Sequence, residues 1–317
     1  MSDHKTPAGA DSDLETLLSS KEVIRRLLRG CEPCQATAHR DLIALEIAAR
    51  GEAEATEPSF AYDAVLDRAV DHVDRAATLS NGERWRFFKA AALLRSGNGV
   101  LAIVETGDMS LKGLGVYEAL LARSWAIRYD NPREMCHLTR VAVEMTDGFD
   151  PATYGDRRVA DLRARAWGEL ANAYRVADRL REAQDAFGRA FDYFHKGSGD
   201  RGLKMRLLDL EASYLGTSRE FNLALQRLAT LAEMHRADGE DHLVGRTLII
   251  KALYAFYRGD TEEACRTIGE GLALIDRDRD PSLALVGAFD YILFLVESDR
   301  FKDAKRALFE NRIRFSA

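Results

Sequence analysis

One thirty-residue stretch of the sequence constrains the fold more than any other. Between residues 165 and 194 the chain reads RAWGELANAYRVADRLREAQDAFGRAFDYF, which combines small and large apolar residues at helical spacing. Ala171 and Ala183 are small enough for two antiparallel helices to approach closely, while Trp167, Tyr174 and Phe187 fill the space on either side. Neither helix can bury its apolar stripe alone, so the pattern predicts a helix pair that stacks against similar pairs.

The small residue of the second helix recurs along the chain and gives the period of the repeat. The markers are Met135, Ala183, Ala224, Ala264 and Ala304, and the spacings between them are 48, 41, 40 and 40. Self-similarity of this kind is typical of stacked helical repeats. The sequence therefore predicts about five units of roughly 40 residues each over residues 110–317.

The best-defined unit resembles a tetratricopeptide repeat (TPR). The residues that carry the resemblance stand at the offsets that define the family: Trp167, Leu170, Ala171, Tyr174, Ala183, Phe187 and Ala190. Ala171 stands where the family usually has glycine, and the period exceeds the usual ~34 residues. The resemblance implies an all-α fold, an α-α superhelix in which antiparallel helix pairs form a TPR-like solenoid.

The rest of the chain divides by composition. We expect a disordered tail at residues 1–12, a small helical module with a C-x-x-C motif at 13–50, a linker at 51–59, and the TPR-like helical repeat domain at 60–317. Ser80 and Glu83 are spaced as a capping box for the helix that follows them. Asn131 is expected to cap a helix with Pro132 at its first position, and Asp260 is expected to cap another.

Cys31 and Cys34 form the C-x-x-C motif, a spacing at which two thiolates can share one zinc ion. The segment resembles the helical zinc-finger module of bacterial anti-sigma factors, in which a histidine just before the motif is a third ligand. Arginine and leucine occupy that place here. His39 or His4 could substitute, and a metal-free module that folds by packing alone is the alternative. We therefore expect no cofactor, with zinc at Cys31 and Cys34 left as an open question.

No catalytic motif emerges from the sequence, so we expect a protein that is not an enzyme. The GSGDRG segment at 197–202 matches G-x-G-x-x-G but follows a predicted helix, so a helix-terminating turn is expected instead of a dinucleotide site. A net charge of −6 gives no reason to expect direct nucleic-acid binding. No run of about 18 apolar residues is present, which predicts no membrane span, and four cysteines favour the cytoplasm.

The TPR resemblance also implies where a protein or peptide partner would bind. In that family the first helix of each unit lines the concave surface. The corresponding residues here are Arg128, Arg165, Asn172, Arg175, Arg246, Phe256 and Tyr257. Several arginines with an aromatic pair would suit an acidic or C-terminal carboxylate peptide, although Gly168 stands where the carboxylate-clamp subset has lysine. Replacing Arg165, Arg175 and Arg246 by Glu is predicted to abolish partner capture.

The end of the repeat array suggests a second contact surface. The last predicted unit has no clear polar capping helix, which terminal repeats usually need for solubility. One interpretation is a contact with a partner chain, including self-association, or with a continuation absent from this sequence, through Phe289, Tyr291, Phe294, Leu308 and Phe309. Helices that curl to cover themselves are the alternative. Together with the cysteine module, the repeats resemble a class of bacterial TPR proteins. This implies a cytoplasmic protein–protein interaction scaffold in bacterial regulation or signalling, with an anti-sigma-like transcriptional regulator as the alternative.

Overall fold

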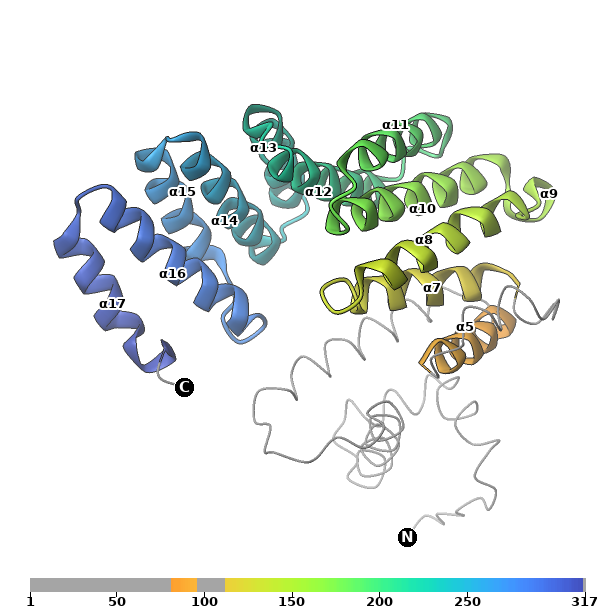
Figure 1. The fold of residues 1–317 in the computed structure, drawn as a ribbon, viewed down its shortest axis with the longest axis horizontal. Coiled ribbons are helices and arrows are strands. Elements are labelled where there is room, and N and C mark those ends of the chain that lie inside the picture. The colour runs from red at the N-terminus through yellow and green to blue at the C-terminus, as the bar shows by residue number, and fades with distance from the viewer. Residues whose placement is uncertain (1–80, 96–111, 316–317) are drawn as a thin grey trace, which may run out of the picture. The chain divides into compact units, whose positions relative to one another are not determined.

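The computed structural model describes residues 81–95 and 112–315, and every regular element in that part of the chain is an α-helix (Figure 1). The chain divides into two compact units, residues 1–119 and 120–317, with the division inside helix α7 (Leu114–Ala126). The predicted tail, cysteine module and linker all lie outside the described residues.

The described part of the first unit contains helix α5 (Asn81–Arg95) and the start of α7. Gly115 lets these two backbones meet, since a Cβ there would lie 2.0 Å from the carbonyl oxygen of Glu83. The Glu83 carboxylate accepts a hydrogen bond from the Gly115 N–H at 2.7 Å. Glu83 thus ties α5 to α7. Ser80, its predicted capping partner, lies outside the described residues.

The second unit is built from helix pairs that follow one another along the chain. After the end of α7 its helices are α8 (Pro132–Asp147), α9 (Pro151–Tyr154), α10 (Asp156–Val176), α11 (Leu180–Lys196), α12 (Arg201–Thr217), α13 (Phe221–Ala237), α14 (Asp241–Arg258), α15 (Thr261–Leu274), α16 (Pro281–Glu297) and α17 (Phe301–Phe315). Helices α10/α11, α12/α13, α14/α15 and α16/α17 form the pairs, and each pair packs on the next. We call α10, α12, α14 and α16 the first helices.

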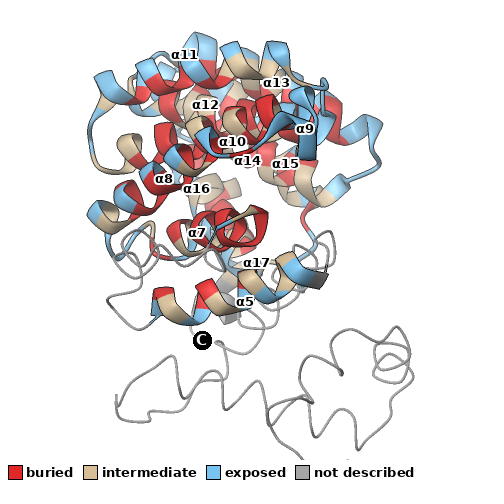
Figure 2. Cartoon of the chain, turned by 90° about the vertical axis from the view of Figure 1, so that its right-hand side faces the viewer, coloured by how far each residue is buried: buried red, intermediate tan, exposed pale blue. Residues whose placement is uncertain are grey.

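The small marker residues confirm the predicted repeat. Ala183, Ala224 and Ala264 are completely buried, and Ala304 is 5% exposed. Met135, the marker of the earlier unit on α8, is completely buried too. In Figure 2 the helices of the described part carry buried residues on one side and exposed residues on the other, as expected of amphipathic helices that stack.

The turn inside each of the four pairs has one repeated geometry. Asp178, Arg219, Gly259 and Asp299 adopt left-handed backbone conformations, with φ of 58°, 60°, 99° and 57°. In every case the next residue donates its N–H to the carbonyl oxygen five residues earlier, at 2.8 or 2.9 Å. This bond satisfies a carbonyl that would otherwise lack a partner at the end of the helix. The spacings between these turns are 41, 40 and 40 (219 − 178, 259 − 219, 299 − 259), and they match the spacings of the alanine markers.

Two of the predicted helix caps can be compared with the structure. Asn131 caps α8 as predicted, because its side-chain oxygen accepts the Glu134 N–H at 3.1 Å and Pro132 opens the helix. The prediction for Asp260 was wrong in part. It occupies the N-cap position of α15, but its side chain makes no capping bond. Its carboxylate is engaged by the Arg258 guanidinium at 2.6 Å, which competes for the same oxygen atoms.

Candidate partner-binding face

Three arginines occupy the same place on successive first helices. Arg165 on α10, Arg206 on α12 and Arg246 on α14 lie one repeat period apart (206 − 165 = 41 and 246 − 206 = 40). Sequence reasoning named Arg165 and Arg246 but missed Arg206. The signal was available, since counting one period from either named arginine leads to Arg206.

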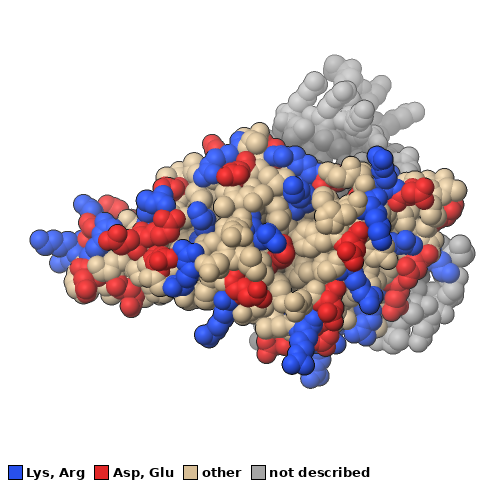
Figure 3. Space-filling view, turned by 90° about the horizontal axis from the view of Figure 1, so that it is seen from above, with Lys and Arg blue, Asp and Glu red and all other residues tan. Residues whose placement is uncertain are grey.

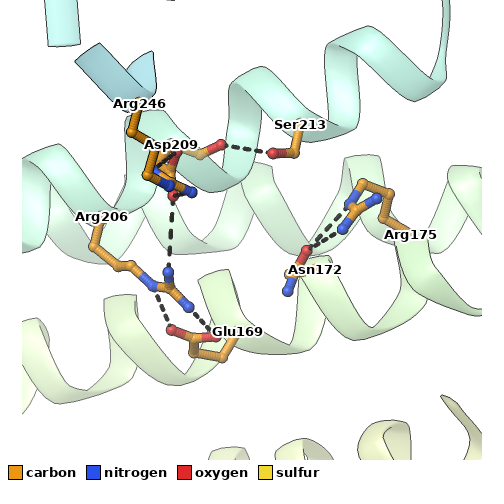
Figure 4. A network of polar contacts seen from close by, with 7 residues as sticks. All are labelled: Glu169, Asn172, Arg175, Arg206, Asp209, Ser213 and Arg246. Atoms are coloured by element: carbon orange, nitrogen blue, oxygen red, sulfur yellow. Dashed lines mark hydrogen bonds and ion pairs between the residues drawn. The ribbon is translucent and has the colours of Figure 1, made fainter. Parts of the chain in front are cut away.

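Carboxylates on the preceding first helix neutralise two of these arginines (Figure 4). Arg206 donates from Nε and Nη2 to the two carboxylate oxygens of Glu169, at 2.8 and 3.0 Å. Arg246 donates to both oxygens of Asp209 at 3.1 and 3.3 Å, and Arg206 also lies 3.8 Å from Asp209. Acidic and basic side chains therefore alternate across α10, α12 and α14. We call this arrangement the charge ladder.

The side chains of the charge ladder are partly buried, so breaking one of its ion pairs should cost more stability than breaking an exposed pair. Glu169 is only 5% exposed, and the side chains of Arg206 and Asp209 are 30% and 14% exposed. Burial lowers the pKa of Arg206, but the charges of Glu169 and Asp209 outweigh this effect and hold the pKa above its ordinary value. Paired buried charges of this kind are costly to break, because the remaining charge is left uncompensated.

Arg175, one helical turn beyond Asn172 on α10, has a different environment. Its Nε and Nη2 atoms both donate to the Asn172 side-chain oxygen, at 3.1 and 2.9 Å (Figure 4). Within the described part of the chain no carboxylate forms an ion pair with this guanidinium. Burial lowers the pKa of Arg175, and the more distant Tyr254, Tyr129 and Asp209 offset this only in part. Arg175 is thus a half-buried cation held by a neutral group.

Asn172 is itself a buried polar residue with an unused donor. It is 1% exposed, and its Nδ2 atom has no hydrogen-bond partner among the described residues. Its side-chain oxygen is fully used by Arg175. Asn172 therefore fixes the direction of the Arg175 fork without adding any charge.

Tyr254 of α14 reaches across α12 toward this arginine because Gly216 leaves room for it. A Cβ at Gly216 would lie 2.1 Å from the ring carbon Cζ of Tyr254 and 2.4 Å from its hydroxyl oxygen. Burial raises the pKa of Tyr254, against the opposing charge of Arg175. Gly216 occupies the place on α12 that Arg175 holds on α10 (216 − 175 = 41). The same repeat position therefore carries a cation in one unit and leaves room for the Tyr254 ring in the next.

Aromatic side chains extend the surface toward the end of α7. The guanidinium carbons of Arg128 and Arg206 each lie 4.3 Å from the Trp125 ring centroid. Arg128 also lies 4.5 Å from the ring of Tyr129, which is 79% exposed. Such contacts hold arginine side chains in place through cation–π attraction. Trp125 was not among the residues chosen from the sequence.

The remaining predicted residues are placed differently. Arg165 is half-buried. Phe256 belongs to the packing between α14 and α16, where its ring stacks on Phe294 at 4.4 Å between centroids. Tyr257 is 58% exposed and contacts the ring of Phe221. The structure thus brings Asn172 and Arg175 into direct contact and leaves Phe256 packed against the core.

The structure explains why lysine is absent from position 168. A Cβ at Gly168 would lie 2.4 Å from Cδ2 of Leu207 on α12, so no side chain fits between these two first helices without a shift. The departure from the carboxylate-clamp pattern follows from this close packing.

The cysteines, histidines and carboxylates of the described part of the chain do not gather into a metal site. No group of three or more His, Cys, Asp or Glu residues there could hold a metal ion, and Cys136 and Cys265 are free and buried. The GSGDRG segment is a turn, as expected: α11 ends before Gly197, and Asp200 caps α12. Cys31 and Cys34 lie outside the described residues. No helix searched there is long and apolar enough to cross a membrane.

Charges of both signs are interspersed on the face of the molecule shown in Figure 3. Ion pairs form within and between neighbouring helices of the described part, including Arg201 with Asp238 at 3.0 Å and Arg227 with Glu211 at 2.6 Å. Many arginines of the described helices therefore already have acidic partners, and the neutral surroundings set Arg175 apart from them.

Comparison with known proteins identifies the fold. No family model matches the chain, and no curated protein matches it. Among solved structures, the apo form of RapI is similar over 95% of this chain and 76% of its own, with a TM-score of 0.55 and 13% sequence identity. A kinesin light chain protein with nearly identical TPR-like repeats, from Podosopora anserina, matches 62% of this chain and 94% of its own, with a TM-score of 0.49 and 12% identity. The fold is an all-α, TPR-like solenoid of antiparallel helix pairs.

Proposed function

We propose that this protein is a non-catalytic interaction scaffold and that Arg175 is the anchor for an acidic segment of a partner protein. The TPR-like fold supports the first part, because stacked helix pairs create extended surfaces suited to protein partners. Fold alone does not fix a function, so the proposal depends on the site. The single observation that carries it is a half-buried guanidinium whose hydrogen bonds, within the described residues, go to the neutral Asn172.

The charge ladder explains why Arg206 and Arg246 are poorer anchors. Arg206 and Arg246 already form bidentate ion pairs with Glu169 and Asp209, respectively. A partner's carboxylate would have to compete with these contacts. Arg175 is partly removed from water and has no ion-pair partner among the described residues. An incoming carboxylate would form that ion pair and offset the cost of desolvation.

The neighbours of Arg175 give the site direction and apolar surface. Asn172 holds the guanidinium fork in one orientation, which lowers the entropy lost when a carboxylate binds. Tyr254 lies near the fork, while Tyr129 and Tyr257 offer exposed rings. An acidic segment with apolar residues beside its carboxylate is the partner chemistry that fits.

The structure also changes which substitution tests the proposal. Glutamate at position 246 would stand against Asp209, so the triple replacement of Arg165, Arg175 and Arg246 would destabilise the helix stack as well as the site. Arg175→Gln removes the guanidinium charge and its two hydrogen bonds to Asn172 but breaks no ion pair of the charge ladder. Arg181→Gln is the matched control, because Arg181 is an exposed arginine six residues away on α11.

The experiment is affinity capture from the source cell with the wild-type chain, Arg175→Gln and Arg181→Gln, followed by mass spectrometry of the bound proteins. We expect partners that wild type and Arg181→Gln retain and Arg175→Gln loses by about tenfold, a change typical of losing one charge-assisted pair. Equal recovery with all three chains would rule out Arg175 as the anchor. Circular dichroism of the three chains checks that helicity is unchanged.

A further inference from the structure

The last helix pair exposes side chains that are covered at the same place in earlier pairs. Leu308 on α17 is 49% exposed. Its counterparts one, two and three periods earlier are Ile268, Leu228 and Phe187, which are 0%, 1% and 4% exposed. In each earlier unit, the first helix of the next pair packs on that pair. In the described part of the chain, no helix follows α17.

Helix α16 shows the same contrast. Phe289 is 59% exposed, whereas Ile249, one period earlier, is 4% exposed. Ile249 is covered by α16 itself, since a Cβ at Gly287 would lie 3.0 Å from its Cδ1 atom. Val296 corresponds in the same way to Phe256, which stacks on Phe294 of the next first helix. The residues left uncovered form the open stacking face: Phe289, Asp290, Leu293, Val296, Phe301 and Leu308.

One member of the open stacking face is charged, and its counterpart shows what it lacks. Asp290 lies three repeat periods after Glu169 (290 − 169 = 121). Glu169 is the residue that Arg206 of the next first helix contacts through both of its carboxylate oxygens. Asp290 is half-buried among the described residues and has no partner among them, and this burial raises its pKa. An incoming helix with an arginine at the place of Arg206 would supply the missing charge.

We propose that the open stacking face binds an amphipathic helix of a partner protein that presents an arginine to Asp290. The proposal is independent of the Arg175 site, which lies on other helices. Charge complementarity selects this occupant over a second α16, because α16 (PSLALVGAFDYILFLVE) contains no Lys or Arg. Two copies of α16 face to face would offer Asp290 no cation.

The existing stacks also specify the residue that follows the arginine. On α12 the residue after Arg206 is Leu207, and it packs over Gly168. On α16 the corresponding residue is Gly287, and it packs beside Ile249. A large side chain thus meets a small one in the α10/α12 and α14/α16 stacks. Since Phe289 is large, the partner helix should carry a small residue directly after its arginine.

A peptide derived from the protein's own α12 is a suitable probe. It comprises residues 200–218 with Leu207→Ala, is held helical by a lactam staple on its solvent side, and carries a fluorophore for anisotropy measurements against the full chain. Saturable binding is expected. Asp290→Arg in the protein should weaken it about tenfold or more, and Arg206→Glu in the peptide should restore binding to that variant. Glu262→Arg, the same charge change at an exposed site on α15, should leave binding unchanged.

Three results would overturn the proposal. The first is the absence of saturable binding to the full wild-type chain. The second is binding that neither Asp290→Arg nor Phe289→Glu weakens, which would place the peptide elsewhere. The third is concentration-dependent self-association in sedimentation that Phe289→Glu abolishes, which would make a second copy the occupant. All variants change exposed or half-exposed positions, and retained helicity by circular dichroism is required before comparison.

Discussion

The left-handed residue in each helix-pair turn gives a prediction that depends only on backbone geometry. Arg219 has φ of 60°, a conformation that costs an ordinary side chain about 1–2 kcal/mol because its Cβ crowds the following carbonyl. Gly259, its equivalent in the next pair, avoids this cost. We predict that Arg219→Gly stabilises the protein.

The expected size follows from two opposing contributions. Glycine removes the left-handed strain, but its greater freedom in the unfolded chain costs about 0.5–1 kcal/mol. The side chain of Arg219 is exposed and makes no hydrogen bond or ion pair within the described structure, so nothing else is lost. The net gain should be about 0.5–1 kcal/mol. Asp299→Gly should gain less, because aspartate tolerates this conformation better than arginine does.

Urea unfolding followed by circular dichroism measures the effect as a higher midpoint at an unchanged slope. Two controls bracket it. Gly259→Ala should destabilise by about 1 kcal/mol, although a Cβ there would meet no atom within 4 Å. Ala177→Gly, at an ordinary φ of −84°, should also destabilise, because no strain is present to relieve. A lower midpoint for Arg219→Gly, with Gly259→Ala tolerated, would refute the backbone argument.

Two further predictions concern buried ionisable side chains. Glu169→Gln should lower the free energy of unfolding by about 2 kcal/mol, because the partly buried Arg206 loses its two-pronged partner. Urea unfolding would show it, and a loss below about 0.5 kcal/mol, as for an exposed pair, would argue against a structural role for the ladder. Burial lowers the pKa of His235 and of His242, so the unfolded chain binds more protons than the folded chain near the ordinary histidine pKa. Stability should therefore fall as pH drops through about 6.5, and His235→Gln should flatten that dependence in urea midpoints measured from pH 7.5 to 5.5. An unchanged pH dependence in His235→Gln would show that the pKa of His235 does not differ between the folded and the unfolded chain.

The repeat could be predicted from the sequence because it depends on residue size at fixed spacing. Only small residues fit where two helices cross, as Ala183, Ala224 and Ala264 do, so small residues recur at a regular spacing along the chain. The left-handed turns were not predicted, since Asp178 and Arg219 give little sign of a conformation that glycine usually adopts.

The site was harder to predict because it depends on how neighbouring first helices are staggered. The ladder joins residues 37 apart, about one helical turn less than the period, so Glu169 meets Arg206 and Asp209 meets Arg246. Arg165, Arg175 and Arg246 could be found from the sequence, whereas Arg206 was missed, and the sequence does not reveal which arginines a carboxylate already neutralises. The same limit applies to Phe256, whose side chain packs on Phe294.

If Arg175 anchors an acidic segment, exchanging its charge with that of an acidic residue on a captured partner should first break and then restore the contact. The measurement is the dissociation constant between that partner and the wild-type, Arg175→Glu and Arg181→Glu chains, by titration calorimetry. We expect Arg175→Glu to weaken binding about tenfold or more and Arg181→Glu to leave it unchanged. Changing one acidic residue of the partner to Arg should restore binding to Arg175→Glu. Equal dissociation constants for all three chains would show that Arg175 is not the anchor.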